Sequence, residues 1–484
     1  MNIQTPEWVR HAVFYQIFPD RFAFSAAVAK PAFLEPWDSA PTVHGYKGGD
    51  LLGVAEHMDY LHDLGVTALY FTPVFTSAAN HRYHTHDYFT IDPILGGNAA
   101  FRTMLDAAHA RGIRVVLDGV FNHASRGFYQ FNHTLENGPH SPYLDWFQFR
   151  QLPPNAYDLT KPPGYEAWWG YHALPKFNTA TPAVREFLFS VAEYWIRQGI
   201  DGWRLDVPGE IADDSFWQEF RARVKAINPD AYIVGEIWND SRHWLQGDQF
   251  DAVMNYLFAE RVIAFTIGAH LDKPLVRDQG WDPGHPLDGA GFALAIGTLL
   301  DLYPTEITEV QLNLLDSHDT ARFLTMARGD VTALTLATLF QMTYPGAPSI
   351  YYGDEIGMEG RRDPDCRRTF PWDPARWNMG LRDYFKQAIA MRRAHPALRT
   401  GVYQGLYASD GVYAFARALG DDYVVVAMNT SRARRLLHLP VTDALSGSGP
   451  WQILLGEGQA VVQGSVLEVA LPPRGGLALA PPLR

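Results

Sequence analysis

Four acidic residues stand at or just after the ends of short apolar segments, each beside a residue that can bind a sugar or move a proton. They are Asp118 in LDGVFNH, Asp206 in GWRLDVPGE, Glu236 in VGEIW and Asp319 in LLDSHDT. One such acid would most often be a solvated loop residue or a helix cap. Four acids that share this position, each next to Asn, Arg, Trp or His, indicate a catalytic site.

Two of these acids have surroundings that suit opposite roles in cleaving a glycosidic bond. Cleavage with retention needs one carboxylate that attacks the anomeric carbon and a second carboxyl that protonates the leaving oxygen. Arg204 precedes Asp206 by two residues on the same strand face, where its charge favours an ionised Asp206. Glu236 follows apolar residues and precedes Trp238, which favours its protonated form. This pattern predicts a retaining glycoside hydrolase. The alternatives are that Arg204 and Asp206 form a purely structural ion pair, and that Trp238 only lines the site or packs in the core.

Eight short apolar segments, separated by stretches of helical period, are expected to supply the strands that carry these acids. They run over 12–18, 66–71, 113–120, 202–207, 231–237, 252–256, 310–316 and 348–353. Each is continuously apolar rather than alternating, as expected of parallel strands that are buried on both faces. The predicted fold class is therefore α/β, a (β/α)8 TIM barrel, in which the carboxyl ends of the strands converge on one face.

The spacing of these segments also predicts three parts of the chain. Residues 1–120 and 181–396 form the catalytic barrel. Between them, residues 121–180 are rich in Pro, Asn, His and aromatic side chains, and they make a loop too long for an ordinary strand-to-helix connection. We therefore expect an inserted subdomain after the third strand. From 397 to 484 short alternating runs separated by Gly, Asp and Ser predict a C-terminal antiparallel β domain.

Composition excludes several other classes of protein. A content of 47% hydrophobic and 19% charged residues is typical of globular proteins. The net charge of −13 and the lack of a Lys/Arg run exclude nucleic acid as a partner. No apolar run reaches the ~18 residues that span a bilayer, so we expect no membrane partner, and the first twenty residues do not read as a signal peptide. With Cys366 as the single cysteine, the expected location is the cytoplasm.

The motifs resemble those of the α-amylase superfamily of glycoside hydrolases, in the usual order and on the expected strands. DGVFNH at 118–123, GWRLDVPGE at 202–210, EIW at 236–238 and LLDSHD at 314–319 resemble its four signature regions. GGDLLGV at 48–54 and GAPSIYYGDEIGM at 346–358 resemble two more. The resemblance implies a barrel with an inserted subdomain and a C-terminal β domain, acting on α-glucan oligosaccharides.

The resemblance also implies a role for each matching residue. Asp206 would be the nucleophile, Glu236 the general acid/base, and Asp319 the third acid, which grips sugar hydroxyls. The implied substrate-binding residues are Tyr83, Asp118, His123, Arg204, Trp238, His318, Asp363 and Arg367. Tyr83 would stack under the glucose at the cleavage point, and the two histidines would stabilise developing charge through ring N–H groups. Asp363 and Arg367 in DPDCRR would bind sugar hydroxyls.

Within the superfamily, LPKFN at 174–178 looks like the MPKLN segment of the neopullulanase and cyclomaltodextrinase branch. Glu210, where many amylases have His, points the same way. The expected substrates are maltooligosaccharides and maltodextrins, with cyclodextrins and pullulan as further candidates. The chain departs from the branch in two ways: its first expected strand begins near residue 12, which leaves no room for the usual N-terminal β domain, and His84 stands where the branch has Asp.

We predict no required cofactor and no metal-binding residue. The Asn/Asp-rich loop that often binds calcium in the superfamily would follow FPDRF, where this chain reads AFSAAVAKPAFLEPW. Because carboxylate and amide oxygens are missing there, calcium is not predicted in that loop. A second calcium position near Asn122, beside the inserted subdomain, stays open, and the sequence assigns no oligomeric state.

Two other functions are compatible with the sequence. A transglycosylase on the same scaffold, trehalose synthase-like or glucan-transferring, would form the same covalent intermediate on Asp206 and pass it to a sugar rather than to water. A non-catalytic carbohydrate-binding scaffold protein would use the same fold without the chemistry. Such proteins typically lose an acid, and all three acids are present here together with Arg204.

Overall fold

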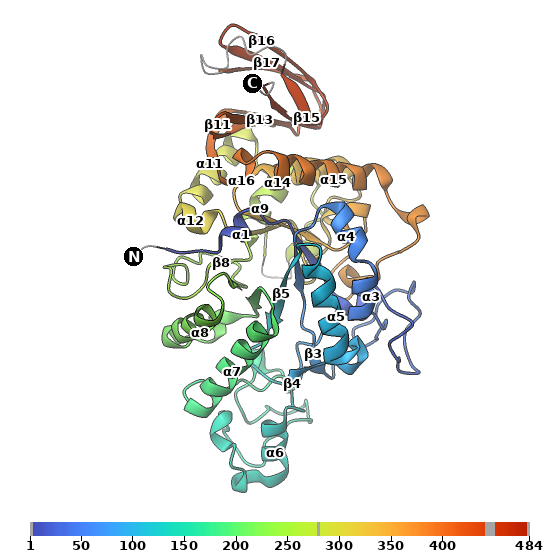
Figure 1. Cartoon of the computed structure of the whole chain (residues 1–484), viewed down its shortest axis with the longest axis vertical. Coiled ribbons are helices and arrows are strands. Elements are labelled where there is room, and N and C mark those ends of the chain that lie inside the picture. Colours follow the sequence, from blue (N-terminus) through green and yellow to red (C-terminus); the bar gives the residue numbers. More distant parts are fainter. Residues whose placement is uncertain (1–2, 278–280, 441–450, 482–484) are drawn as a thin grey trace.

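The computed structural model describes residues 3–277, 281–440 and 451–481. Its centre is a sheet of eight parallel strands that neighbour one another in chain order (Figure 1). These are β1 (Phe14–Ile17), β2 (Ala68–Phe71), β5 (Arg114–Gly119), β6 (Gly202–Leu205), β7 (Tyr232–Gly235), β8 (Ala252–Val253), β9 (Leu312–Leu314) and β10 (Ala347–Tyr351). A parallel bridge between Met254 and Leu312 joins the two outer strands and closes the barrel. The predicted α/β barrel is confirmed, and all eight strands lie inside or within a residue of their predicted segments.

The longer helices lie between these strands, and six of the nine begin at an Asp or Asn whose side chain accepts a backbone N–H of the first turn. They are α3 (Leu51–Glu56), α4 (Met58–Leu64), α5 (Gly97–His109), α7 (Pro182–Gln198), α8 (Asp214–Ile227), α9 (Tyr256–Thr266), α11 (Gly289–Leu300), α14 (Val331–Thr343) and α15 (Met379–Ala394). Short helices are α1 (Glu7–Arg10), α2 (Pro19–Phe22), α10 (Pro274–Arg277), α12 (Thr305–Thr308), α13 (Phe323–Met326) and α16 (Ala397–Thr400). In α7, Pro182 occupies the first turn and Gly199 ends the helix at a φ of 101°, a value that glycine adopts without strain.

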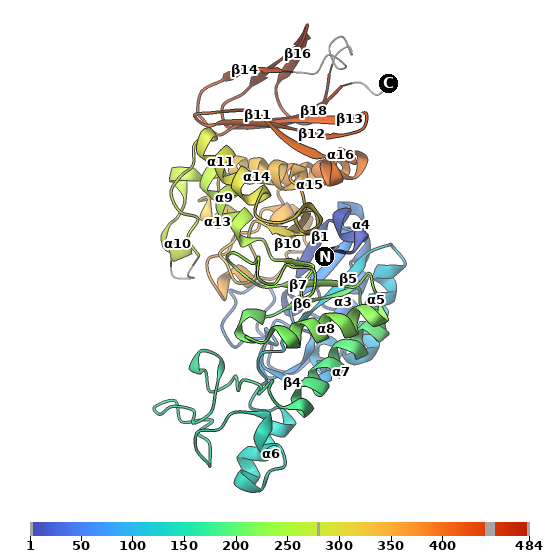
Figure 2. The same ribbon diagram turned by 90° about the vertical axis from the view of Figure 1, so that its left-hand side faces the viewer.

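Two excursions from the barrel carry residues of the predicted site. The antiparallel strands β3 (Phe75–Ser77) and β4 (Thr85–Ile91) bracket the turn that holds Tyr83. Between β5 and α7 the chain forms α6 (Tyr129–Asn137) and a set of isolated bridges, one of which pairs His123 with Lys176. Figure 2 shows this second segment at the end of the molecule opposite the C-terminal strands. It returns to the barrel next to His123, so it borders the site.

The C-terminal strands form two antiparallel sheets. One has the order β11 (Val402–Ser409), β12 (Val412–Leu419), β13 (Asp422–Asn429), β18 (Gly475–Ala480), β15 (Gln452–Gly456), and the other β14 (Arg435–Pro440), β17 (Val466–Leu471), β16 (Gln459–Gln463). Strand β12 is buried on both faces: Ala414 and Ala416 face the second sheet's core, while Tyr413 and Phe415 contact Phe340 of α14. The predicted antiparallel C-terminal sheets are thus confirmed, and they rest on the barrel helices (Figure 1).

Residues 1–2 and 278–280 of the predicted barrel, and residues 441–450 and 482–484 of the predicted C-terminal domain, lie outside the described residues. Within the described part of the chain, no helix is long and apolar enough to cross a membrane.

Candidate active site

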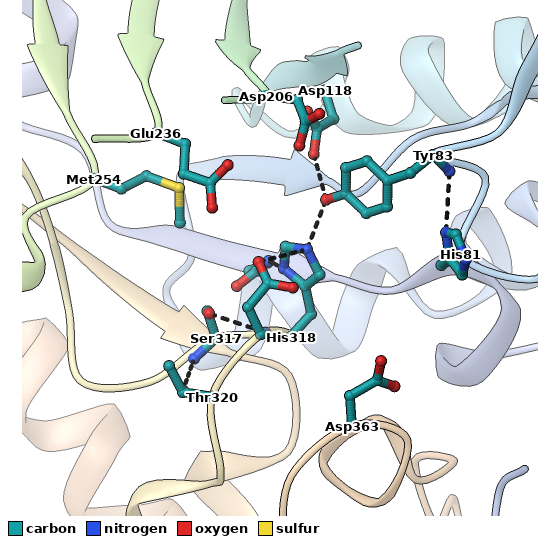
Figure 3. A network of polar contacts seen from close by, with 12 residues as sticks. His81, Tyr83, Asp118, Asp206, Glu236, Met254, Ser317, His318, Thr320 and Asp363 are labelled. Carbon is teal, nitrogen blue, oxygen red and sulfur yellow. Dashed lines mark hydrogen bonds and ion pairs between the residues drawn. The ribbon is translucent and has the colours of Figure 1, made fainter. Parts of the chain in front are cut away.

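The four acids that the sequence singles out converge at the carboxyl ends of barrel strands, three of which, β5, β6 and β7, are neighbours. Asp118 lies within β5, Asp206 directly follows β6, Glu236 directly follows β7, and Asp319 lies in the loop after β9. In Figure 3 the side chains of Asp206 and Glu236 reach from adjacent strands toward the space bordered by Tyr83 and His318. The barrel geometry alone brings them together, since their strands are sequence neighbours and pair in parallel.

Arg204 is the hub of this cluster. Its Nη1 donates to both Asp118 oxygens at 2.9 Å and to Asp206 Oδ1 at 3.2 Å, and its Nη2 lies 3.0 Å from Glu236 Oε2. The guanidinium is fully buried, and Asp206 and Glu236 are 7% and 9% exposed. One buried cation therefore balances three carboxyls, so the cluster has more carboxyls than positive charge to pair them with.

Arg204 favours an ionised Asp206, as the sequence predicts, but this excess of carboxyls opposes that effect. Burial raises the pKa of Asp206 well above its usual range; Arg204 opposes the rise, while Glu236 and Asp118 add to it. Burial likewise raises the pKa of Glu236 against the opposing charge of Arg204, as expected, and raises the pKa of Asp118 to about 6. Because Arg204 is shared, and its Nη1 contacts both oxygens of Asp118, the protonation of each carboxyl depends on that of the others, and all three pKa values are raised.

Besides its ion pair with Arg204, the carboxyl of Glu236 accepts two hydrogen bonds. The indole Nε1 of Trp238 donates to Oε1 at 3.0 Å, and the backbone N–H of Val207 donates to Oε2 at 3.1 Å. Val207 directly follows Asp206 and has a φ of 36° and a ψ of 50°, a left-handed conformation that is costly for a β-branched residue. Trp238 also stacks on Tyr256, with ring centroids 3.8 Å apart. The backbone is therefore strained at Val207, the residue whose N–H contacts Glu236.

A chain of hydrogen bonds ties the opposite wall to the same cluster. Gln16 Nε2 lies 2.7 Å from Nδ1 of His318, whose Nε2 lies 2.6 Å from the hydroxyl of Tyr83. If the Gln16 amide donates, the imidazole proton is on Nε2 and faces Tyr83. The Tyr83 hydroxyl donates in turn to Asp118 at 2.8 Å, as the dashed lines of Figure 3 show. Burial lowers the pKa of His318 well below its usual range, so its ring is a neutral donor.

Asp319 lies at the edge of this wall and joins it to Arg367. His318 Nε2 is 3.1 Å from Asp319 Oδ2, and Arg367 Nη2 donates to Asp319 Oδ1 at 3.3 Å. Arg367 also donates through Nε to the carbonyl of His318 and pairs with Asp363 at 3.0 Å. Asp363 is the outermost member, with 47% of its side chain exposed, and stands apart from the acids in Figure 3.

His123 reaches the site from the start of the inserted segment. It is buried, and its Nε2 has no hydrogen-bond partner among the described residues. Its ring is nearly parallel to that of Trp168, with centroids 5.4 Å apart. Burial lowers its pKa to about 3, so it is a neutral imidazole whose Nε2 is left for a ligand to satisfy.

The structure thus gathers the predicted site residues in one place, with Asp363 at the rim. Four further contributors carried no signal in the sequence: Gln16 and Trp168 orient histidines, the Tyr70 hydroxyl donates to Asp118 at 3.0 Å, and the Val207 backbone contacts Glu236. Tyr70 lies in β2, where the apolar sequence pattern predicts only an aromatic residue of the core. A backbone N–H such as that of Val207 is present in almost every residue, so the residue type does not identify it as a donor. Among the described residues, no group of three or more His, Cys, Asp or Glu side chains is placed to hold a metal ion.

Two family models match consecutive parts of the chain. Residues 16–400 match the α-amylase catalytic domain, and residues 403–479 match the neopullulanase-like C-terminal domain.

The relatives of known name agree with these matches. A cyclomaltodextrinase from a Bacillus species is 46% identical over 92% of this chain and 77% of its own length. Neopullulanase 2 from Thermoactinomyces vulgaris is 44% identical over 98% of this chain and 78% of its own length. Among solved structures, the debranching enzyme from Nostoc punctiforme superposes with a TM-score of 0.91 at 52% identity, covering 99% of this chain and 100% of that one.

Proposed function

The chain belongs to the α-amylase family of glycoside hydrolases, and we propose that it cleaves α-glucosidic bonds in maltooligosaccharides and maltodextrins with retention of configuration. The observation that carries the proposal is the contact of Arg204 with three buried carboxyls, two of which, Asp206 and Glu236, come from adjacent strand ends. Carboxyls that share a titration supply the protonated acid and the ionised nucleophile that retention requires.

In the first step Asp206 attacks the anomeric carbon while Glu236 gives its proton to the departing glycosidic oxygen. The C–O bond to the leaving sugar breaks as a glycosyl ester forms on Asp206, so the proton of Glu236 ends on the new hydroxyl. Trp238 and the Val207 N–H aim the carboxyl of Glu236, and their hydrogen bonds strengthen as it becomes an anion. In the second step Glu236 takes a proton from water, which attacks the ester and releases the sugar.

The remaining site residues hold the sugar whose bond is cleaved. We assign Asp319, His318 and His123 to its hydroxyls and Tyr83 to its face; the unpartnered Nε2 of His123 and the neutral ring of His318 support two of these roles. Asp118 anchors Tyr83 and Arg204 from beneath. Arg367 and Asp363, which pair with each other at the rim, would contact the next sugar away from the cleavage point.

The names of the relatives support cyclodextrins and pullulan as further substrates, because the cyclomaltodextrinase and the neopullulanase cover nearly the whole chain. Water is the proposed acceptor. A transglycosylase would use the same ester and differ only in the group that attacks it, so the acceptor must be measured.

Products formed from maltotriose, β-cyclodextrin, pullulan and soluble starch, separated by chromatography and followed by proton NMR, would test the proposal. We expect short maltooligosaccharides and glucose that appear first as α-anomers, and at least about a 10³-fold loss of rate in Asp206→Ala and in Glu236→Gln. First-formed β-anomers would contradict retention. Longer oligosaccharides or trehalose in excess of glucose and maltose would make the chain a transglycosylase.

We also propose a domain division, a location and a partner for the chain. Separate family matches to 16–400 and 403–479 support a division into a barrel (1–120 and 181–396), an inserted subdomain (121–180) and a C-terminal β domain (397–484). A cytoplasmic location is supported by the single cysteine, Cys366, which is buried and unpaired. The partner is an α-glucan oligosaccharide; a net charge of −13 argues against nucleic acid.

A further inference from the structure

The loop after β1 contains a buried carboxylate, Asp50, whose counter-ion is a lysine of the same loop. Asp50 is fully buried at the start of α3, where its Oδ1 accepts the Gly53 N–H at 2.7 Å and caps the helix. Its Oδ2 accepts the Ser25 N–H at 2.8 Å and the Lys30 ammonium at 2.7 Å. A carboxylate this deep needs a cation beside it, and Lys30 supplies one.

The ammonium of Lys30 has the surroundings of a small cation site. Besides Asp50 it donates to the backbone carbonyl of Ile94 at 3.1 Å, and the lysine side chain is only 18% exposed. A carboxylate and a carbonyl oxygen are the kind of ligands that Ca²⁺ takes. This is the loop in which the family resemblance implies calcium, and the residues do not fit it. In the described part of the chain Asp50 is the one carboxylate paired with Lys30, and the Lys30 ammonium fills the position.

The position matters because it joins three parts of the chain. Ile94 lies in a single 3-10 turn (Pro93–Leu95) that Asp92 caps. Asp92 Oδ2 in turn accepts Arg82 Nε at 3.0 Å, and Arg82, buried with a φ of 62°, directly precedes Tyr83. Lys30 therefore connects the loop after β1 and the start of α3 to the segment that supports Tyr83.

From these contacts we infer that the Lys30 ammonium replaces a structural cation at Asp50, so that calcium neither binds this loop nor is needed by it. A lysine carries its cation covalently, and it cannot be removed by a chelator. The inference goes beyond the proposed function, because it concerns stability and metal content and holds whichever sugar the site takes. It also predicts that the position accepts Ca²⁺ once the ammonium is replaced by oxygen ligands.

The experiment measures Tm and bound calcium for the full chain and its variants, with EDTA and with added Ca²⁺. We expect the wild-type Tm to be the same in both and no calcium to copurify. Lys30→Met, which keeps the length and removes the charge, lowers Tm by about 2–5 °C in either condition. Lys30→Glu places an oxygen close to the former ammonium, so its Tm falls at least as far in EDTA and recovers with Ca²⁺.

The matched control is Lys161→Met, since Lys161 is also paired with an aspartate but is 74% exposed, and its Tm is expected to match wild type within about 1 °C. A wild-type Tm that rises with Ca²⁺, or stoichiometric calcium in the purified protein, would overturn the inference. So would a Lys30→Met variant as stable as the control. If Lys30→Met does not fold, Lys30→Glu decides: a calcium-dependent Tm supports the inference, and a Tm indifferent to calcium contradicts it.

Discussion

Two groups of buried arginines, Arg204 alone and Arg392 with Arg417, differ in the groups that they contact, and this difference decides whether a buried arginine serves the site or the fold. Arg204 at the strand ends contacts Asp118, Asp206 and Glu236. Arg392 of α15 and Arg417 of β12 are equally buried, yet donate to backbone carbonyls: Arg392 to those of residues 342, 344, 346 and 398, and Arg417 to those of 343, 398 and 401. The first group collects charge at the site, and the second joins the barrel to the C-terminal sheet.

The electrostatic consequences are opposite. Burial alone would lower the pKa of each arginine. At Arg204 the charges of Asp118 and Glu236 outweigh burial and raise the pKa. Among the described residues no carboxylate contacts Arg392 or Arg417. Burial, with the nearby charge of Arg417, lowers the pKa of Arg392 to about 9, and burial lowers the pKa of Arg417 to about 10. Backbone carbonyls do not titrate, so these contacts tie strands and helices together and add no acid or base. The carboxyls that contact Arg204 are themselves titrating groups with raised pKa values, which is what acid–base chemistry uses.

The largest effect should come from Arg204→Met. Removing the cation that contacts all three buried carboxyls should lower kcat/KM by about 10³-fold or more, because Asp206 then holds its proton. The pKa values of the carboxyls, already raised by burial, rise further, so the folded state binds more protons than the unfolded one. Stability is then retained at low pH and lost as pH rises through the raised folded pKa values. Tm compared at pH 5 and pH 8 measures this; a Tm deficit that shrinks at pH 8 would contradict the shared charge balance.

Asp118→Asn should have the next largest effect. It removes a negative neighbour of Asp206 and frees Arg204 Nη1 from its contact with both Asp118 oxygens, and both changes lower the pKa of Asp206. The acid limb of the kcat/KM profile, which follows ionisation of the nucleophile, should therefore move to lower pH. We expect a loss of about 10- to 100-fold at the optimum, since Tyr83 loses an anchor. An acid limb that moves to higher pH would show that Asp118 does not oppose ionisation of Asp206.

Arg392→Met makes the same substitution in the other group and should leave catalysis nearly unchanged. The buried carbonyls that Arg392 now satisfies would lose their donor, so Tm should fall by about 3–8 °C while kcat changes less than about twofold. Thermal unfolding and initial rates at 25 °C measure the two quantities. A large change in kcat with an unchanged Tm would contradict the claim that Arg392 stabilises the fold and takes no part in catalysis.

Val207 should have the smallest effect on stability and a modest effect on kcat. Glycine adopts the left-handed conformation freely, so Val207→Gly relieves strain but no longer fixes the N–H that contacts Glu236. We expect kcat to fall about 3- to 10-fold with Tm within about 2 °C of wild type. The control is Val207→Asn, because asparagine also tolerates a positive φ but restricts the backbone more than glycine does. Its kcat should lie between those of wild type and Val207→Gly.

The sequence predicts the barrel and the acids well because both depend on local patterns. Continuous apolar runs mark strands such as β5, and an acid at the end of each run marks the site. Relations between strands are not encoded locally. The spacing of Arg204 and Asp206 predicts an ion pair between these two residues alone. The pairing of β5 with β6 brings Asp118 beside Arg204, so that the guanidinium is shared between carboxyls. Backbone donors such as the Val207 N–H are equally invisible to residue type.

The most direct test of the account is to trap the glycosyl ester. Glu236→Gln treated with α-maltosyl fluoride can form the ester, because fluoride leaves without a proton, but cannot activate water to break it. Mass spectrometry of the digested protein should find one maltosyl addition, on the peptide that contains Asp206, and none in the Asp206→Ala, Glu236→Gln double variant. A maltosyl addition on another residue, or β-maltose released directly with no ester formed, would contradict a retaining mechanism through Asp206.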